Sequence, residues 1–355
     1  MRTINKFCLA LATLALTACS ASSNKGVVNP IAEYEAMTPF QFSDIRVKHV
    51  GLISDMDLRI QMEQGLMDLS KDYFSPQDVG FRTHVFLDFD TLDATDGSRG
   101  LLGTNRDDNP NGLNPAREEA FETGNGLVTG ATILLDIYEL DFYKNDHLKG
   151  ISLAMVVNDS LEQDGQDYLI TEEVMQNYLE VTSNKLVSYM RERYNEIAKN
   201  IPIYIAAYQL NTQDDSSKGH FMYEGLFQDN KSQFSKIEEE WVNIPSSNFT
   251  KIDAKTADEF NTFKQDIATV LPDQTYVVGT ARYEKKALKK MDLTVTAHGK
   301  TASEILAVCQ TIQEGMDTFT DTDCTYLITV YNDEEVYAMI QRLKNTKETT
   351  IVSKL

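Results

Sequence analysis

Cysteine is scarce in this sequence of 355 residues, which contains four copies at positions 8, 19, 309 and 324. Only Cys309 and Cys324 lie beyond the first 19 residues, too few for a disulfide framework. A predicted helix at 302–319 contains Cys309, and a predicted strand begins at Cys324. The ten helical residues after Cys309 span about 15 Å, whereas a disulfide joins Cα atoms within roughly 7 Å. We therefore expect two buried free thiols.

Basic side chains are also scarce, with 33 Lys and Arg against 54 Asp and Glu, a formal charge of −21. This field repels nucleic acid and anionic headgroups, so we expect no nucleic-acid partner and no membrane binding through a basic patch. Solubility explains the acidity more simply than an acidic binding surface does. The sequence also has no long hydrophobic run. Its first apolar segment, residues 7–16, has half of the roughly 20 residues that a membrane-spanning helix needs.

That short apolar segment follows Arg2 and Lys6 and ends in "LTAC", with Ala18 directly before Cys19. A basic start, an apolar core and small residues before a cleavage site are typical of an exported signal peptide. The cysteine after Leu-x-Ala indicates a bacterial lipoprotein signal, cut between Ala18 and Cys19. Residues 1–18 are then removed, and the thiol of Cys19 carries diacylglycerol on a polar tether at 19–40. We expect a protein that is lipid-anchored at the outer face of the cytoplasmic membrane.

The remaining sequence predicts an α+β protein of two domains, at 41–230 and 231–347. Apolar spacing predicts a helix at 55–75 and a long helix at 171–199 in the first domain. Alternating residues at 131–143 and 150–158, and again at 201–210 and 220–227, predict two antiparallel hairpins. The second domain has the order β-α-β-β-α-β, which predicts a ferredoxin-like (alpha-beta plait) unit closed by a last helix at 333–343.

Residues 88–130 are rich in Asp, Asn and Gly and predict an irregular segment that is either functional or mobile. Within it, "DDNPNGLNPARE" at 107–118 fits the spacing of a calcium-binding loop, whose oxygen ligands would come from Asp107, Asn109, Asn111 and Glu118. Two prolines and the lack of an upstream helix favour a plain turn instead. Calcium is the one cofactor that the sequence suggests.

Motifs for catalysis are missing from the sequence. It has no HExxH zinc motif and no G-x-S-x-G nucleophile turn. The glycine-rich stretch at 124–130 precedes a strand, whereas a phosphate-binding loop follows one. We therefore expect a protein that is not an enzyme.

Several short segments in the same order resemble the CamS family, the sex-pheromone precursor lipoproteins of low-GC Gram-positive bacteria. They are the cysteine motif at 16–19, "MEQGLMDLSKDYFSP" with Gly65, Leu66 and Met67, "GLNP" from Gly112 through Leu113 and Asn114 to Pro115, the strand "IPIYIAAYQL", and the stretch from "EEEWVNI" to "YAMIQRLKN". The resemblance implies that a peptide is cut from the signal sequence, here "LATLALTA" at 11–18. It carries no established activity for the folded body.

Two functions fit these observations. The first is a surface lipoprotein whose folded body is a binding or interaction module, with a protein or peptide partner. The second is the solute-binding lipoprotein of a transporter. Bilobed solute receptors show repeated β-α units on mostly parallel sheets, whereas this sequence predicts hairpins, so the first function is favoured.

Overall fold

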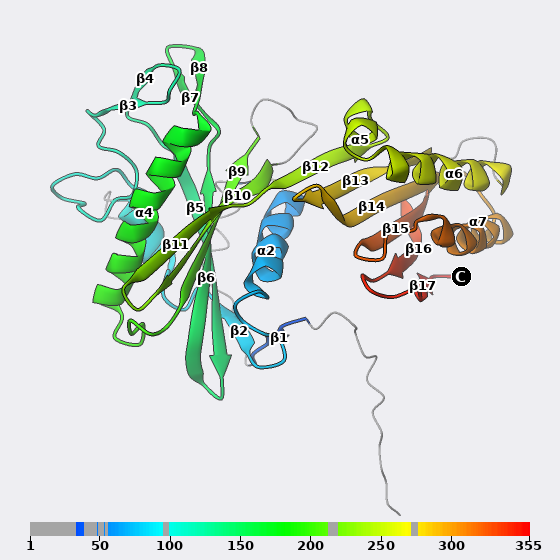
Figure 1. The fold of residues 1–355 in the computed structure, drawn as a ribbon, viewed down its shortest axis with the longest axis horizontal. Coiled ribbons are helices and arrows are strands. Elements are labelled where there is room, and N and C mark those ends of the chain that lie inside the picture. The colour runs from blue at the N-terminus through cyan, green and yellow to red at the C-terminus, as the bar shows by residue number, and fades with distance from the viewer. Residues whose placement is uncertain are drawn as a thin grey trace, which may run out of the picture.

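The computed structural model of the protein describes residues 33–38, 48, 53, 56–94, 99–211, 219–270 and 276–355. These residues form two large sheets of seven and six strands, which lie side by side along the long axis of the molecule (Figure 1). The first sheet ends at Lys236 and the second begins at Glu239. The protein thus has the predicted α+β class.

The seven-stranded sheet has the order β1-β2-β5-β6-β9-β10-β11. Its strands are β1 (Glu35–Ala36), β2 (Gly80–Thr83), β5 (Leu134–Lys144), β6 (His147–Val157), β9 (Ile203–Leu210), β10 (Gly219–Gln228) and β11 (Lys231–Lys236). Both predicted hairpins are confirmed, because β5 pairs antiparallel with β6 and β9 pairs antiparallel with β10. β6 and β9 run parallel at the centre of the sheet, and α4 (Glu172–Arg193) connects them.

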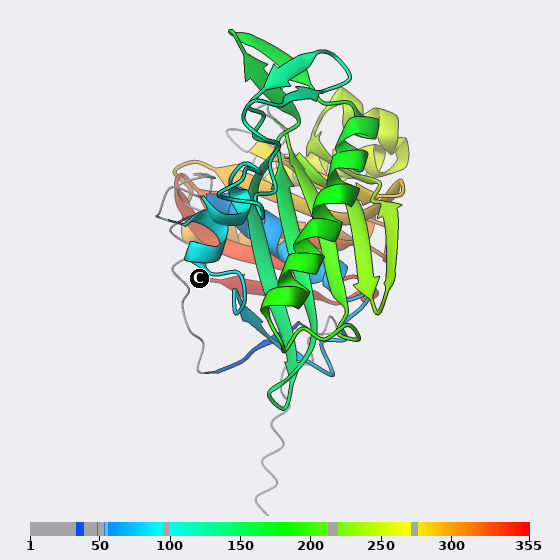
Figure 2. The same cartoon turned by 90° about the vertical axis from the view of Figure 1, so that its left-hand side faces the viewer.

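Helices cover both faces of this sheet. Figure 2 shows α4 in front of the strands and α2 (Met56–Ser70) behind them. One apolar cluster joins α4 to the near face, and another joins α2 to the far face. Since both faces are buried, the central strand β6 is apolar on both sides, and its residues 150–157 are all buried. The resulting unit has three layers.

The predicted irregular segment at 88–130 contains short elements packed against the α4 face. They are α3 (Phe89–Asp93), η1 (Gly100–Leu102), β3 (Ala120–Glu122) and β4 (Leu127–Thr129). A further hairpin of β7 (Ser160–Gln163) and β8 (Gln166–Leu169) lies beside β3 and β4 at one end of the sheet (Figure 1). Leu92, Leu101 and Leu113 are buried in the cluster that contains α4. This segment therefore contributes to the hydrophobic core.

The six-stranded sheet has the sequential order β12-β13-β14-β15-β16-β17. Its strands are β12 (Glu239–Ile244), β13 (Tyr276–Glu284), β14 (Ala287–Ala297), β15 (Thr325–Asn332), β16 (Glu335–Arg342) and β17 (Thr349–Ser353). The helices α5 (Ser247–Ile252), α6 (Ala254–Val270) and α7 (Ala302–Gly315) and the turn η2 (Met316–Thr318) share one apolar cluster with the strands. Cys309 and Cys324 are buried free thiols in that cluster, which confirms the prediction.

The predicted ferredoxin-like unit is wrong in its strand order. In a split β-α-β unit, the two strands that a helix connects run parallel with another strand between them. Here β12 and β13 are antiparallel neighbours, with Ile244 opposite Gly279. The helices between them therefore bring the chain back to the Ile244 end of β12, where β13 begins. The six elements occur in the predicted sequence, but only β14-α7-β15 forms a parallel crossover in this sheet.

Two further predictions in this region need correction. The predicted helix at 333–343 is the strand β16, in which Ala338, Ile340 and Arg342 are buried on one side. Arg342 donates to the carbonyl oxygens of Met316 and Phe319, and this anchors the strand below η2. The predicted boundary near residue 230 also falls early, because β11 pairs with β10 as the last strand of the first sheet.

Candidate functional site

The two sheets meet where the chain passes from β11 to β12. The backbone N–H of Ile237 donates to the carbonyl oxygen of Met222 at 3.0 Å. The backbone N–H of Phe221 on β10 donates to Oε2 of Glu239 on β12 at 2.8 Å. The carboxylate of Glu239, in the second sheet, thus binds a backbone N–H of the first sheet.

Glu239 makes this contact from a buried position. Its Oε1 accepts a hydrogen bond from Nε1 of Trp241 at 2.9 Å, and the guanidinium of Arg282 lies 3.8 Å away. Burial raises the pKa of Glu239 above its ordinary value, although Arg282 and the two N–H donors oppose the shift. The carboxylate therefore has a donor on each oxygen, as a buried charge requires.

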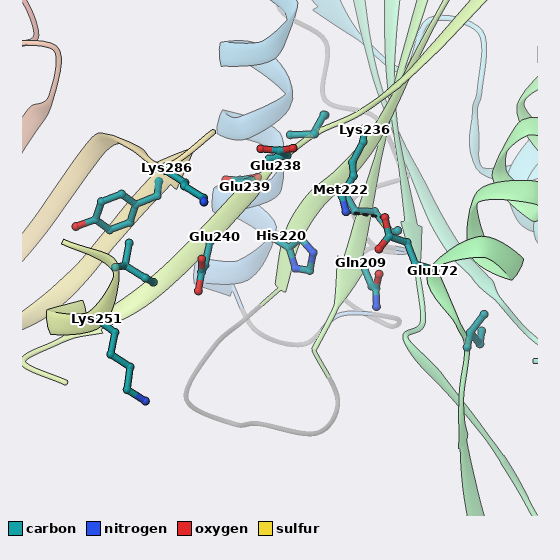
Figure 3. Close-up of a pocket in the computed structure, with 14 residues that line it drawn as sticks. Glu172, Gln209, His220, Met222, Lys236, Glu238, Glu239, Glu240, Lys251 and Lys286 are labelled. Atoms are coloured by element: carbon teal, nitrogen blue, oxygen red, sulfur yellow. Dashed lines mark ion pairs between the residues drawn. The ribbon is translucent and has the colours of Figure 1, made fainter. Parts of the chain in front are cut away.

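Beside this junction lies a cleft of about 710 Å³, within the range of small-ligand sites. Figure 3 shows side chains from both sheets around it. Its walls combine aliphatic, amide and charged groups: Ile170, Glu172, Gln209, His220, Met222, Lys236, Ile237, Glu238, Glu239, Glu240, Lys251, Ile252, Tyr283 and Lys286. The cleft therefore presents both signs of charge above an apolar base.

The charged groups are distributed unequally between the two walls. On the first-sheet side, Lys236 and Glu172 form an ion pair at 2.6 Å, drawn as a dashed line in Figure 3. On the second-sheet side, Lys251 and Lys286 form no ion pair with any residue that the structure describes. Burial lowers the pKa of His220, so its imidazole is neutral near pH 7 and can both donate and accept.

The turn that carries Lys286 is energetically unfavourable. Lys285 and Lys286 join β13 to β14, with φ of 49° and 66°. Two-residue hairpin turns of this kind favour Asn-Gly or Asp-Gly, because most side chains disfavour positive φ. The turns after β5, β7, β10 and β15 each begin with Asn or Asp. Local strain of this kind is concentrated at functional sites.

The GLNP motif at 112–115 has a structural role. The side chain of Asn114 is buried, and its Nδ2 donates to the carbonyl oxygens of Leu102 and Leu134. Its Oδ1 accepts from the backbone N–H groups of Ile133 and Leu134. Lys185 of α4 donates to the carbonyl oxygen of Gly112 at 2.7 Å. Of the other motif residues, Leu113 is buried and Pro115 is half-buried. The motif thus fastens the 100–118 segment to the start of β5 and to α4.

The GLM motif lies on α2. A Cβ at Gly65 would lie 2.4 Å from the ring of Phe221, so only glycine allows the helix to approach β10 this closely. Leu66 is buried and Met67 half-buried in the cluster behind the sheet. This motif therefore fixes the packing of α2 against Phe221, the same residue whose backbone N–H binds Glu239 at the junction.

The four candidate calcium ligands are placed differently from one another. Asp107, Asn111 and Glu118 are exposed, whereas Asn109 is buried and its Nδ2 donates to the carbonyl oxygens of Gly100 and Thr104. Gly112 leaves no space for a Cβ beside Thr104. No group of three His, Cys, Asp or Glu among the described residues could hold a metal ion. The calcium site remains a prediction from the sequence. Ala18 and Cys19 lie outside the described residues.

A second unusual feature, missed by the sequence analysis, is a buried pair of carboxyl groups on β5. Glu139 Oε2 accepts from the backbone N–H of Leu87 at 2.8 Å, and Asp141 Oδ2 accepts from that of Val85 at 3.1 Å. The other oxygen of each group is buried without a hydrogen-bond donor among the described residues. Burial raises the pKa of Glu139, and it raises that of Asp141 to about 7. Burial therefore disfavours the charged form of both groups, and the charge of Asp141 adds to the effect on Glu139.

This pair makes stability depend on pH. A carboxyl group whose pKa is higher in the folded state binds more protons there, so the free energy of unfolding falls as pH rises. For Asp141 the fall begins near the ordinary pKa of about 4 and continues to about 7. Replacing Glu139 by Gln supplies an N–H donor for Asp141 and removes one acid. We expect Glu139→Gln to be about 1–3 kcal/mol more stable than the wild type at pH 8 and nearly equal at pH 5, measured by urea unfolding.

The exposed Glu119 provides the control, because Glu119→Gln changes an unburied acid nearby in the chain. The free energy of unfolding of Glu119→Gln should follow that of the wild type from pH 5 to pH 8. Stability curves of wild type and Glu139→Gln that stay parallel between pH 5 and pH 8 would refute the raised pKa of Glu139.

Comparison with known proteins gives two kinds of match. The family model described as "CamS sex pheromone cAM373 precursor" matches residues 40–348. The chain is also similar to a solved sex pheromone precursor from Lactobacillus salivarius, with 20% identity, a TM-score of 0.76, and coverage of 91% of this chain and 96% of that one. The C-terminal domain of the staph-cAM373 precursor from Staphylococcus aureus shows 21% identity, a TM-score of 0.69, and coverage of 83% and 96%. At these identities the structures show a shared fold. No curated protein sequence matches the chain.

Proposed function

Because the chain belongs to the family of CamS sex pheromone cAM373 precursors, whose model matches residues 40–348, we propose that it is a lipid-anchored surface protein. Its folded body binds a ligand between the two sheets. The family is described as a pheromone precursor, and this description assigns no catalytic activity. Among the described residues, each helix is too short or too polar to cross a bilayer.

The support for the anchor comes from the sequence. A short apolar core and "LTAC" at 16–19 fit a lipoprotein signal, and the lipid on Cys19 would hold the body at the outer face of the membrane. Cleavage before Cys19 also releases residues 1–18, which end in "LATLALTA". That fragment is the source of the sex-pheromone-like peptide that the family description suggests for this chain.

The observation that supports ligand binding is the cleft at the junction. It is lined from both sheets, and binding sites occur preferentially between domains. The chain crosses from the first sheet to the second near Ile237, and the Phe221–Glu239 hydrogen bond joins the two sheets beside the cleft. No observation favours the transporter alternative, because the parallel neighbours in the two large sheets, β1-β2, β6-β9 and β14-β15, are fewer than the antiparallel ones.

The charges of the cleft favour a short zwitterionic peptide. Lys251 and Lys286 offer ammonium groups that have no acidic partner among the described residues, and such groups suit a terminal carboxylate. Glu238 and Glu240 supply carboxylates on the same side for a terminal amine. Gln209 and neutral His220 can pair with peptide amides, and the base of Ile237 and Met222 can cover small apolar side chains.

The test uses free peptides of two to five Ala and Leu residues as probes, with melting temperature as the readout. A probe at about 100 times its dissociation constant stabilises the folded protein by roughly 2.7 kcal/mol. We expect a rise in melting temperature for the wild type, and at least about a tenfold weaker affinity for Lys251→Met/Lys286→Met, because two charge-assisted contacts are lost.

Two controls make the result specific. Lys264→Met removes an exposed charge of α6 that does not line the cleft, so it should bind like the wild type. The same peptides with acetylated and amidated ends should bind weakly. Failure of every probe to raise the melting temperature, or equal affinity in the cleft variant, would contradict the proposal.

A further inference from the structure

The outer edges of the two large sheets differ in how they discourage pairing with other chains. Charged side chains and short length are the usual protection of an edge strand. In the first sheet, β1 has two residues, and the opposite edge β11 carries Lys231 and Lys236. In the second sheet, β12 carries Glu239 and Glu240, whereas β17 reads "TTIVS" without a charge. The edge at β17 is therefore the unprotected one among these four.

The free backbone groups of β17 can be identified from its pairing with β16. The N–H of Lys354 donates to the carbonyl oxygen of Tyr337 at 2.9 Å, just beyond the strand. Hydrogen-bonded positions alternate along an antiparallel strand, so Val352 and Thr350 direct their backbone groups toward β16. The backbone groups of Thr349, Ile351 and Ser353 consequently face outward. No described strand pairs with them.

We propose that β17 pairs antiparallel with β17 of a second copy of this chain, about a two-fold axis at Ile351. The outward residues then face one another: Ile351 faces itself, and Thr349 faces Ser353 of the partner subunit. This register also places Glu348 opposite Lys354 of the partner subunit, twice by symmetry. An axis at residue 349 or 353 would shorten the paired segment and lose this charge match.

The side chains on the open face agree with this register. Val352 is 69% exposed and Met339, its cross-strand neighbour, is 44% exposed. Pairing places Thr350 of the partner subunit directly opposite Val352 and covers this apolar surface. Lys354 contacts Glu335 at 3.1 Å, but both side chains are exposed, so exchanging that partner costs little. The strand lies beyond the matched family region, which ends at residue 348.

Cysteine cross-linking of the full chain in membranes tests the register. Two Ile351→Cys side chains would sit on the axis, with Cα atoms about 5.5 Å apart, within disulfide range. Two Thr349→Cys residues would be roughly 13 Å apart along the strands and cannot join. After oxidation with copper phenanthroline, we expect at least about tenfold more covalent dimer from Ile351→Cys than from Thr349→Cys. A mixture of Thr349→Cys and Ser353→Cys chains should cross-link to each other.

Proline substitution provides an independent test in detergent solution. Ser353→Pro removes an outward-facing N–H at an exposed position, so it keeps the β16 ladder and the melting temperature while blocking the edge. We expect sedimentation equilibrium to show a monomer for Ser353→Pro and a monomer–dimer mixture for the wild type. Thr350→Pro, which loses a ladder bond, should instead lower the melting temperature. Equal cross-linking of the 351 and 349 variants, cross-links of a mass other than a dimer, or unchanged self-association of Ser353→Pro would overturn the proposal.

Discussion

Replacing Cys19 by Ser is expected to remove mature protein from the membrane fraction. The sulfur of Cys19 is the atom that accepts the lipid, and a hydroxyl cannot replace it in that linkage. The mature body has a strong excess of acidic groups, so it has no electrostatic attraction to anionic lipid that could compensate. Fractionation and intact mass should show uncleaved precursor or released protein in place of the lipidated chain.

The same variant tests the released peptide. Cleavage before Cys19 produces a fragment that ends at Ala18, so mass spectrometry should detect such fragments in wild-type medium and lose them in Cys19→Ser. Cys8→Ser is the matched control, because Cys8 lies in the removed segment and its substitution should leave both readouts unchanged. Mature membrane-bound protein in Cys19→Ser would disprove the anchor.

Substituting Asn114 by Ala should cause the largest loss of stability among single changes in the 100–118 segment. The side chain satisfies four backbone groups, two carbonyl oxygens and two N–H groups, all in a buried site. Each buried group left without a partner costs about 1–3 kcal/mol. We expect the free energy of unfolding to fall by at least about 3 kcal/mol, measured by urea unfolding.

Two further substitutions separate this role from general effects of the loop. Asn111→Ala changes an exposed residue of the same loop and should stay within about 0.5 kcal/mol of the wild type. Asn114→Asp keeps the acceptor oxygens but loses the Nδ2 donor and buries a charge, so it should also be strongly destabilising. A stability for Asn114→Ala equal to that of Asn111→Ala would show that this hydrogen-bond network does not hold the segment.

Local patterns in the sequence determined several properties of this protein. Apolar spacing of three and four predicted α2, α4 and α7, and alternation predicted both central hairpins, because these periods reflect which side chains one element can bury. The spacing of Cys309 and Cys324 predicted free thiols in the same way. The family followed from short collinear motifs, two of which prove to hold tight packing contacts at Gly65 and Asn114.

Contacts between distant segments decided the rest. The segment 333–343, predicted as a closing helix, is the strand β16, because pairing with β15 and the bonds of Arg342 to the carbonyl oxygens near η2 hold it extended. The strand order and the cleft lining join residues far apart in the chain, and the Glu139–Asp141 pair on β5 finds its backbone donors in the distant residues Leu87 and Val85. His220, Lys236 and Lys286 looked like ordinary strand and turn residues until the fold placed them around one cleft. Only tertiary packing brings such side chains together, since local sequence periodicity specifies a face of an element and not its neighbour.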